Sequence, residues 1–492
     1  MVAPVTIVDS PSGVRSPVRG LGVVVAACAI AFAPARLLAQ DPPPRALELE
    51  EVLDSVMTRY PPLLAALIEK DITSGRVRQA EGAFDLTLNA GANAVPSGYY
   101  DGRTGSVILE QALQSWGAKV YGGDRLSSGL LPNYNLQRTP EDGQVTAGIR
   151  LSLLRQGRID RERATREQSR IDAELADPFI ARQRLEFTRA ATISYFNWVN
   201  AGFRLRAAEE LLRLANDRDT AIGEQVRRGA LAPIVRIDNE RLVVSRRLAT
   251  IQNQRRFEAA TIELSLFLRD PHDQPVLANR KRLPPAFPAP RPQDPARLSQ
   301  DTTDALARRP ELRNIALSID RVRIETDLAR NDLLPNLDLT LEARQSPTQR
   351  RLSDIEPLET RAGVELRIPL QRREASGRLQ VAESQIRRLQ ADEQFARDRI
   401  GAEVRDTFSA LSAATGQITQ AQRNVVLAVM LEDAERLRFR QGASDLLALQ
   451  IREQATFDAR LGEVDAFSDY FRALANYRAA TGNTTREGAR SP

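Results

Sequence analysis

The sequence predicts a mainly α-helical fold with a membrane β-barrel, built from two copies of one unit: two strands and a long helical hairpin. Three observations support this prediction. Residues 187–270 align onto 400–483 without a gap, at a constant difference of 213 (442 minus 229). The stretch 371–441 contains no proline, and four short segments alternate between apolar and polar residues. A gap-free repeat indicates long packed helices, because one inserted residue would rotate everything beyond it by about 100°.

The four alternating segments predict strands whose polar residues share one face. They lie at about 84–94, 144–154, 334–345 and 360–370. A soluble sheet with one wet face would alternate in the same way, but segments of about ten residues in an exported chain favour a transmembrane barrel with a polar lumen. We expect a long loop at about 95–143 to join the first pair, and a short loop at about 346–357 to join the second.

A helical hairpin is predicted after each pair of strands, at about 155–269 in the first copy and about 371–481 in the second. Near the first turn, mostly apolar and small residues recur at alternating intervals of three and four from Leu205 to Val226, which is coiled-coil spacing. We call this row the apolar seam; Asp219 is its one charged member. Pro178 predicts a kink or a break in the first long helix. An ordinary coiled-coil rod is the simpler alternative for helices of this length.

The predicted elements divide the chain into five segments. These are a signal peptide at 1–39, a first repeat at 40–270, a connector at 271–296, a second repeat at 297–483 and a C-terminal tail at 484–492. The density of prolines in the connector excludes a helix there and marks an irregular link between the repeats.

The N-terminus has the pattern of a secretory signal peptide. Arg15 and Arg19 precede a short apolar run at 21–32, and small residues follow as far as Ala39. We expect cleavage near Ala39, with acylation of Cys28 as the alternative. The apolar run is too short to span a bilayer, and no later segment is apolar for long enough either. The protein is therefore expected to be exported.

Composition argues against several classes of function. The 69 basic and 64 acidic residues are mixed along the chain, so we expect no binding to nucleic acid, which needs a clustered basic patch. Cys28 and His272 are the only residues of their types in the sequence. They cannot form an intrachain disulfide, a multi-residue Cys or His metal site, or a catalytic His dyad. We expect no enzymatic activity, cofactor or metal.

The turns of the two hairpins share an Arg-x-Gly-Ala pattern. Glycine suits the left-handed position after a helix end, and arginine in the last turn faces the negative end of the helix dipole. Ser444 is positioned to cap the second returning helix. The candidate tip residues are Arg227, Gly229 and Ala230 in the first turn, and Arg440, Gly442 and Ala443 in the second.

Two copies of strand, strand, long helix, Arg-x-Gly turn and returning helix behind a signal peptide resemble the TolC-like outer membrane efflux protein family. The likeness rests on the two turns, on the Arg-Arg-Pro-Glu-Leu stretch at 308–312, on the strand opening at 334–337 and on the strand-to-helix turn at 368–370. It covers about 45–482, and the order and duplication of the motifs are more specific than any one of them.

The resemblance implies a homotrimer with a 12-stranded barrel among outer-membrane lipids and an α-helical barrel across the periplasm. It implies that the tips dock on a periplasmic adaptor (membrane fusion) protein bound to an inner-membrane pump. The chain would then be the outer-membrane channel of a tripartite efflux system, with a type I protein secretion conduit as the alternative. Four strands cannot close a barrel, whereas three chains of four give twelve.

The acidic residues near the turns depart from the family pattern. In the family an acid usually lies about six positions after the tip glycine and narrows the periplasmic entrance, but Val235 and Ala448 stand there in this chain. The carboxylates nearest to these two positions are Asp238 and Asp445. Asp219 lies on the apolar seam of the first copy, and Glu432 is the equivalent residue of the second copy. These four residues are the candidate lumen or entrance acids.

A carboxylate on an apolar seam predicts contact with water or with an arginine, because desolvating the charge is costly. If Asp219 and Glu432 face the lumen, three chains would form a ring of six acids that favours cations. A solvated outer face is the alternative reading of the same residues.

Two functions outside the channel class also fit parts of the sequence. A periplasmic adaptor has one helical hairpin flanked by small β-domains, whereas this chain predicts two hairpins, each with two strands. An exported coiled-coil structural protein would not need four alternating strands.

Overall fold

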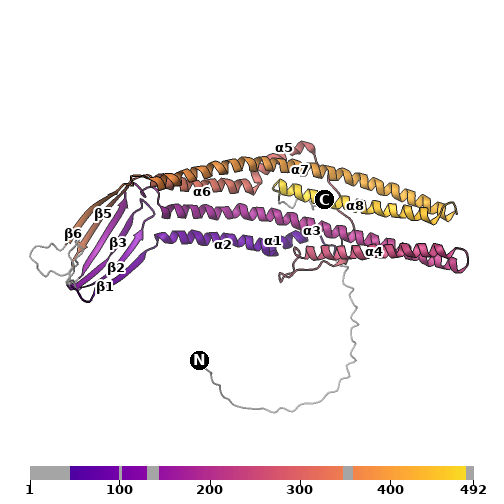
Figure 1. Ribbon diagram of the computed structural model, residues 1–492, viewed down its shortest axis with the longest axis horizontal. Coiled ribbons are helices and arrows are strands. Elements are labelled where there is room, and N and C mark those ends of the chain that lie inside the picture. Colours follow the sequence, from indigo (N-terminus) through magenta and orange to yellow (C-terminus); the bar gives the residue numbers. More distant parts are fainter. Residues whose placement is uncertain (1–44, 99–101, 130–142, 347–357, 484–492) are drawn as a thin grey trace, which may run out of the picture. The chain divides into compact units, whose positions relative to one another are not determined.

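The computed structural model describes residues 45–98, 102–129, 143–346 and 358–483. The predicted signal peptide with Cys28, the C-terminal tail and almost all of the predicted short loop lie outside the described residues. The described chain is mainly helical and contains one antiparallel sheet, which confirms the predicted mixture of long helices and strands (Figure 1).

Each repeat begins with a pair of shorter helices and ends with a pair of long ones. In chain order the elements are α1 (Leu49–Arg59), α2 (Pro61–Glu81), η1 (Gly82–Phe84), β1 (Thr87–Val95), β2 (Gly102–Ala112), β3 (Lys119–Gly129), β4 (Gln144–Ser152), α3 (Arg161–Arg227), α4 (Pro233–Ser265), η3 (Arg280–Arg282), η4 (Pro295–Arg297), α5 (Leu298–Arg308), α6 (Pro310–Asp332), β5 (Asn336–Gln345), β6 (Leu358–Arg367), α7 (Arg373–Arg440) and α8 (Leu446–Ala480). None of the helices in the described ranges is both long enough and apolar enough to cross a membrane.

The sheet has six strands in the order β1-β2-β3-β4-β5-β6, and every neighbouring pair is antiparallel. The four predicted strands correspond to β1, β4, β5 and β6. The prediction of a loop over 95–143 is wrong, because β2 and β3 lie in that stretch and separate β1 from β4. The expected barrel of twelve strands assumed four strands from each of three chains. Because the sheet of one chain has six strands, that number no longer follows.

Glycines within β2 and β3 explain why the sequence pattern did not predict these two strands. Gly105 interrupts the apolar alternation of β2, and Gly122 and Gly123 interrupt that of β3. Gly123 is nevertheless required, because a Cβ there would lie 2.0 Å from the carbonyl oxygen of Val107. The close approach of two strands therefore explains a residue that weakens the strand signal in the sequence.

The sheet has one apolar and one polar face, because residues paired across neighbouring strands point to the same side. Leu88 pairs with Leu109, and Leu339 pairs with Val364. These side chains belong to the apolar face, which is exposed in the single chain: Leu88 is 63% and Val364 69% accessible. The opposite face carries the charged residues of all the strands except Arg103 and Asp124.

Helix α3 runs without interruption from Arg161 to Arg227, so of the predicted kink or break at Pro178 the break does not occur. The ring of Pro178 removes one backbone donor, but the residue is buried. Lys70 of α2 also forms an ion pair of 2.6 Å with Asp177. Packing of a long helix against its neighbour outweighs the loss of one hydrogen bond.

The two long hairpins, α3–α4 and α7–α8, pack against each other through α3 and α8. Aromatic side chains fill this contact, and the rings of Phe196 and Phe471 stack with centroids 3.9 Å apart. Trp198 is fully buried and donates from Nε1 to Thr261 Oγ1 at 3.2 Å. The main core therefore lies where the two repeats meet, at the level of α1 and α5.

The arginine of the Arg-Arg-Pro-Glu-Leu stretch holds the end of α8. Arg309 is 9% exposed, and its Nη1 donates to the carbonyl oxygens of Ala479 and Ala480 at 3.2 and 3.3 Å. The same guanidinium pairs with Glu311 at 2.9 Å and with Glu403 at 3.1 Å. This motif therefore joins α6, α7 and α8.

Candidate functional site

The first hairpin tip is a tight helix end made by Gly229. The residue has φ +73°, which suits glycine, and it follows the cap residue Arg228. Ala230 N donates to the carbonyl oxygen of Gln225 at 2.8 Å, and Gly229 N donates to that of Val226 at 3.0 Å. This bond from the residue after the glycine back over five positions is the Schellman motif that ends many helices.

The second tip has the same geometry. Gly442 also has φ +73°, Ala443 N donates to the carbonyl oxygen of Arg438 at 2.9 Å, and Gly442 N donates to that of Phe439 at 3.0 Å. The returning helix begins with a different cap from the predicted one: Asp445, not Ser444, accepts from the amide of Ala448, at 2.7 Å. Aspartate takes this position because its carboxylate reaches the free amides of the first turn.

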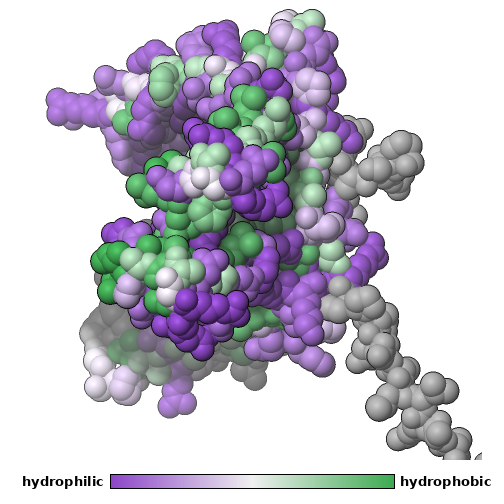
Figure 2. Space-filling model, turned by 90° about the vertical axis from the view of Figure 1, so that its right-hand side faces the viewer, coloured by the Kyte–Doolittle hydropathy of each residue, from purple (hydrophilic) through white to green (hydrophobic). Residues whose placement is uncertain are grey.

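Both tips are uncovered in the single chain. A Cβ added to Gly229 or Gly442 would meet no atom within 4 Å. Arg227 pairs with Glu224 of its own helix, at the surface. Figure 2 views the side on which the hairpins end and shows hydrophobic patches among hydrophilic ones there.

Exposed apolar residues line one face of each outer helix of the hairpins. We call the first row the α4 stripe; its members are 57–66% exposed: Ile234, Ile237, Val244, Leu248 and Ile251. We call the second row the α7 stripe: Val426, Leu427, Met430, Leu431 and Leu437. An apolar stripe at helical spacing is a packing face, and both stripes are exposed in the single chain, so we expect each of them to pack against a partner.

The two seam acids have partners within the chain. Asp219 Oδ1 accepts from Asn239 Nδ2 at 3.0 Å, and Asn239 is fully buried. Glu432 is 13% exposed at its side chain and pairs with Arg436 of the same helix. The structure thus gives Glu432 the arginine partner that the sequence offered as one possibility, whereas Asp219 has an amide partner.

An ion pair between the hairpins lies beside Glu432. Arg218 of α3 pairs with Glu453 of α8, and both side chains are largely buried, at 17% and 9% exposure. Arg436 lies 3.9 Å from the same carboxylate. Sequence reasoning missed this group, because Arg218 and Glu453 lie 235 residues apart and no local pattern connects them.

The two remaining candidate acids lie near the tips. Asp238 is 53% exposed and pairs with Arg241 at 3.5 Å, whereas Asp445 caps α8. Each of the four candidate acids therefore has a partner of its own, and none of these hydrogen bonds and ion pairs joins two of the acids. Within the described ranges, no group of three His, Cys, Asp or Glu side chains is placed to hold a metal ion.

The polar face of the sheet is joined by hydrogen bonds that cross three strands. Glu342 of β5 accepts from Tyr121 of β3 at 2.9 Å, from Thr146 of β4 at 3.0 Å and from Arg344 of β5 at 2.5 Å. Tyr121 reaches it across Gly148, where a Cβ would lie 2.5 Å from the tyrosine ring. The sheet therefore has a polar face joined by hydrogen bonds and an exposed apolar face on its other side. Such a sheet is suited to separate water from lipid.

Residues 302–483 match the family model described as outer membrane efflux protein. A comparison with curated proteins gave no match. Among solved structures, the chain is similar to a membrane protein from Pseudomonas aeruginosa at 16% identity, with a TM-score of 0.64 and 89% of this chain and 91% of that chain covered.

Two further structures are outer membrane channels. The CmeC channel of Campylobacter jejuni is 15% identical, with a TM-score of 0.64 and coverage of 88% of this chain and 85% of that one. The MtrE channel of Neisseria gonorrhoeae in its open state is 16% identical, with a TM-score of 0.61 and coverage of 88% and 89%. At these identities the likeness shows a common fold.

Proposed function

We propose that this chain, which has the fold of TolC-like channels and matches the outer membrane efflux protein family over residues 302–483, is the outer-membrane channel of a tripartite efflux system. The protein is located in the outer membrane and extends into the periplasm. The observation that carries the proposal is the sheet, whose exposed apolar face and polar face alternate residue by residue over strands of 9–11 residues. Strands of this length span a bilayer when tilted.

The functional unit is a homotrimer closed by contacts between unlike edges. One sheet edge, β1, belongs to the first repeat, and the other edge, β6, belongs to the second. The α4 stripe lies on the first repeat and the α7 stripe on the second. Joining first repeat to second repeat around a ring would cover both edges and both stripes at once, which supports a closed head-to-tail assembly.

The trimer forms one conduit from the periplasm to the outside. The barrel presents its apolar face to lipid and its polar face to the lumen. The hairpin tips dock on a periplasmic adaptor that is bound to an inner-membrane pump. The uncovered Schellman turns at Gly229 and Gly442 support this role, because rigid turns with open surroundings give a partner two similar surfaces on each chain.

The seam acids belong to the same proposal. Three copies of Asp219 and Glu432 ring the lumen near its periplasmic end and favour cations. The double substitution Asp219→Asn with Glu432→Gln removes both charges and is expected to lower the cation preference of single channels in planar bilayers. An unchanged reversal potential in a salt gradient would leave these carboxylates as surface charge held by Asn239 and Arg436.

Mass measurement of the detergent-extracted protein tests the assembly. We expect a trimer for the native chain, and dissociation when Ile237→Asp places a charge in the α4 stripe, because an unpaired buried carboxylate is costly. Arg247→Asp is the matched control beside the stripe and is expected to keep the trimer. A native protein that is monomeric in mild detergent, or that fractionates away from the outer membrane, contradicts the proposal.

Transport itself is tested in the producing bacterium. Deleting the gene is expected to lower the concentrations of toxic compounds that stop growth, and the native gene but not the Ile237→Asp variant should restore them. Unchanged sensitivity to a broad panel, together with loss of a secreted protein, would identify a secretion conduit instead.

A further inference from the structure

The β2–β3 hairpin is part of the sheet wall. If it lay outside the wall, β1 and β4 would pair with each other, as β5 and β6 do. Instead β1 pairs with β2 over nine residues and β4 pairs with β3 over seven. The first repeat therefore contributes four strands and the second contributes two.

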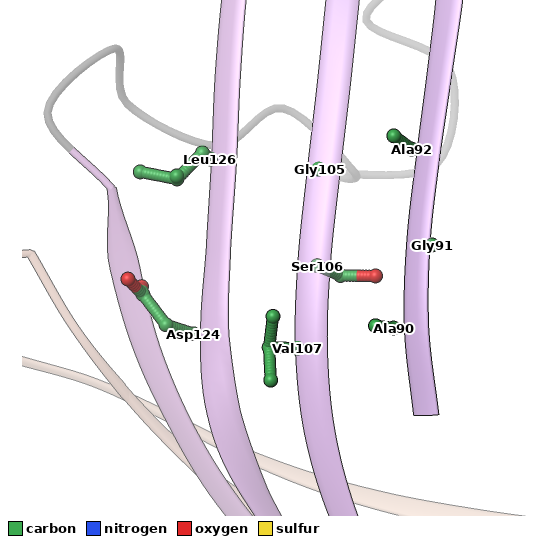
Figure 3. A pocket seen from close by; sticks show the side chains of 8 residues that line it. All are labelled: Ala90, Gly91, Ala92, Gly105, Ser106, Val107, Asp124 and Leu126. Atoms are coloured by element: carbon green, nitrogen blue, oxygen red, sulfur yellow. The ribbon is translucent and has the colours of Figure 1, made fainter. Parts of the chain in front are cut away.

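The hairpin has the same two faces as the other strands. Val107 and Leu109 of β2 and Leu126 of β3 are 44–52% exposed on the apolar face, in line with Val145 of β4. Figure 3 shows Ser106 and Val107 pointing to opposite sides of β2, and Asp124 and Leu126 pointing to the same side of β3. A hairpin that plugged a lumen or lay in water would not need apolar residues in line with those of β1 and β4.

Two contacts fix the hairpin in place. On the polar face, Tyr121 donates to Glu342 of β5 at 2.9 Å, over Gly148 of β4. At the turn between β2 and β3, Gly117 has φ +56°, and a Cβ there would lie 2.5 Å from the carbonyl oxygen of Gln156. The turn thus sits directly on the link from β4 to α3. Trp116 of the same turn is 68% exposed, which suits an aromatic anchor at a membrane surface.

Asp124 is the one charge in the middle of this apolar face. It pairs across the sheet with Val107 on one side and Val145 on the other. A carboxylate that faces lipid is unfavourable, and the two valines beside Asp124 do not compensate for its charge. Single charges on the lipid face of a barrel are nevertheless tolerated at a cost, and aspartate costs less there than lysine or arginine.

We infer that the β2–β3 hairpin widens the membrane pore, so that three chains close a barrel of eighteen strands. This inference rests on the proposed trimeric channel. Strands spaced about 4.8 Å apart and tilted by about 40° give a wall about 36 Å across for eighteen strands, against about 24 Å for twelve. The membrane barrel would then admit larger cargo than the helical part of the conduit. The helical part would therefore set the size limit for transport.

Paired cysteine variants test whether the hairpin is in the wall. The background is Cys28→Ser, because Cys28 is the only cysteine in the sequence. Val107→Cys and Ser106→Cys probe the hairpin, and Val145→Cys and Thr146→Cys are the matched pair on β4. After bimane labelling in phosphatidylethanolamine–phosphatidylglycerol vesicles, spin-labelled lipid is expected to quench the Val107 and Val145 positions, and aqueous iodide the Ser106 and Thr146 positions.

The control pair separates two kinds of failure. If the β4 pair alternates but both hairpin positions are quenched only by iodide, the hairpin lies outside the membrane wall and the inference is overturned. If the β4 pair does not alternate either, the sheet is not in lipid and the proposed channel itself fails.

The width of the barrel is measured directly on the trimer. A nitroxide at Val145→Cys in the same background gives three equivalent labels, whose separation is about 0.87 of the barrel diameter in a threefold ring. Pulsed electron–electron double resonance is expected to give backbone distances of about 31 Å for eighteen strands, whereas about 21 Å would indicate twelve strands and overturn the inference.

Discussion

Removing the carboxylate of Glu453 is expected to loosen the contact between the two long hairpins. Glu453 is 9% exposed at its side chain and pairs with Arg218, which is 17% exposed, while Arg436 lies 3.9 Å away. Glu453→Gln leaves the guanidinium of Arg218 without its carboxylate, whereas Arg436 keeps its ion pair with Glu432. Breaking a buried ion pair from one side costs about 3–5 kcal/mol, and the residual exposure of Arg218 places the expected loss near the lower end, about 3 kcal/mol.

Hydrogen exchange on the intact assembly measures this loss locally. Amides of α3 around Arg218 and of α8 around Glu453 are expected to exchange about 100-fold faster in the variant, since about 1.4 kcal/mol corresponds to a factor of ten. Replacing both partners, with Arg218→Met and Glu453→Met, should recover part of the protection, because no charge is then left buried. Glu210→Gln is the matched control, since Glu210 pairs with Arg213 at 2.7 Å on the exposed surface and should change little. Unchanged exchange in Glu453→Gln would refute the reasoning.

Three further outcomes are expected. Replacing Gly229 and Gly442 together with alanine should destabilise each turn by about 1 kcal/mol, because φ is +73° at both residues although no atom lies within 4 Å of the added Cβ. Trimers should still form while transport falls. Full transport in this variant would argue against docking at the tips. Asp124→Leu should raise the thermal stability of the trimer in lipid, by less than the roughly 2–4 kcal/mol of a basic residue at the midplane, and a loss of stability would place Asp124 in water. Burial raises the pKa of Glu311, but the hydrogen bond from Arg309, a backbone hydrogen bond and the positive charge of Arg309 together outweigh burial and lower the pKa below its usual range. The stabilisation is therefore present above the pKa of the unfolded chain and is lost as the pH falls through the lower folded value. Glu311→Gln should remove this loss from acid-denaturation curves.

The sequence carried enough local information for the helices, the turns and four of the strands. The repeat fixed the lengths of the hairpins, and the proline-free stretch led directly to α7, Arg373–Arg440. Gly229 and Gly442 could be placed because a Schellman turn depends only on its own few residues. These features share one property, which is that neighbours along the chain determine them.

The features that sequence reasoning missed depend on residues far apart in the chain. Strand β3 is held by contacts such as that from Tyr121 to Glu342, which no local pattern reveals. The pairing of Arg218 with Glu453 depends on how α3 and α8 are rotated against each other. The predicted break at Pro178 failed for the same reason, because the packing around the residue, not its own propensity, decides whether α3 continues.

The connector between the repeats has a practical consequence for anyone who modifies the chain. A proline-rich connector is a usual place to insert a tag or a protease site. In this chain, however, the ring of Phe287 stacks on that of Phe467 with centroids 5.2 Å apart. Leu283 is only 7% exposed and packs beside Gly202 of α3. An affinity tag inserted between 283 and 291 would therefore displace part of the interior, and a cut there would not release two independent halves. The turn at 271–273 is exposed and is the better insertion point for a reporter.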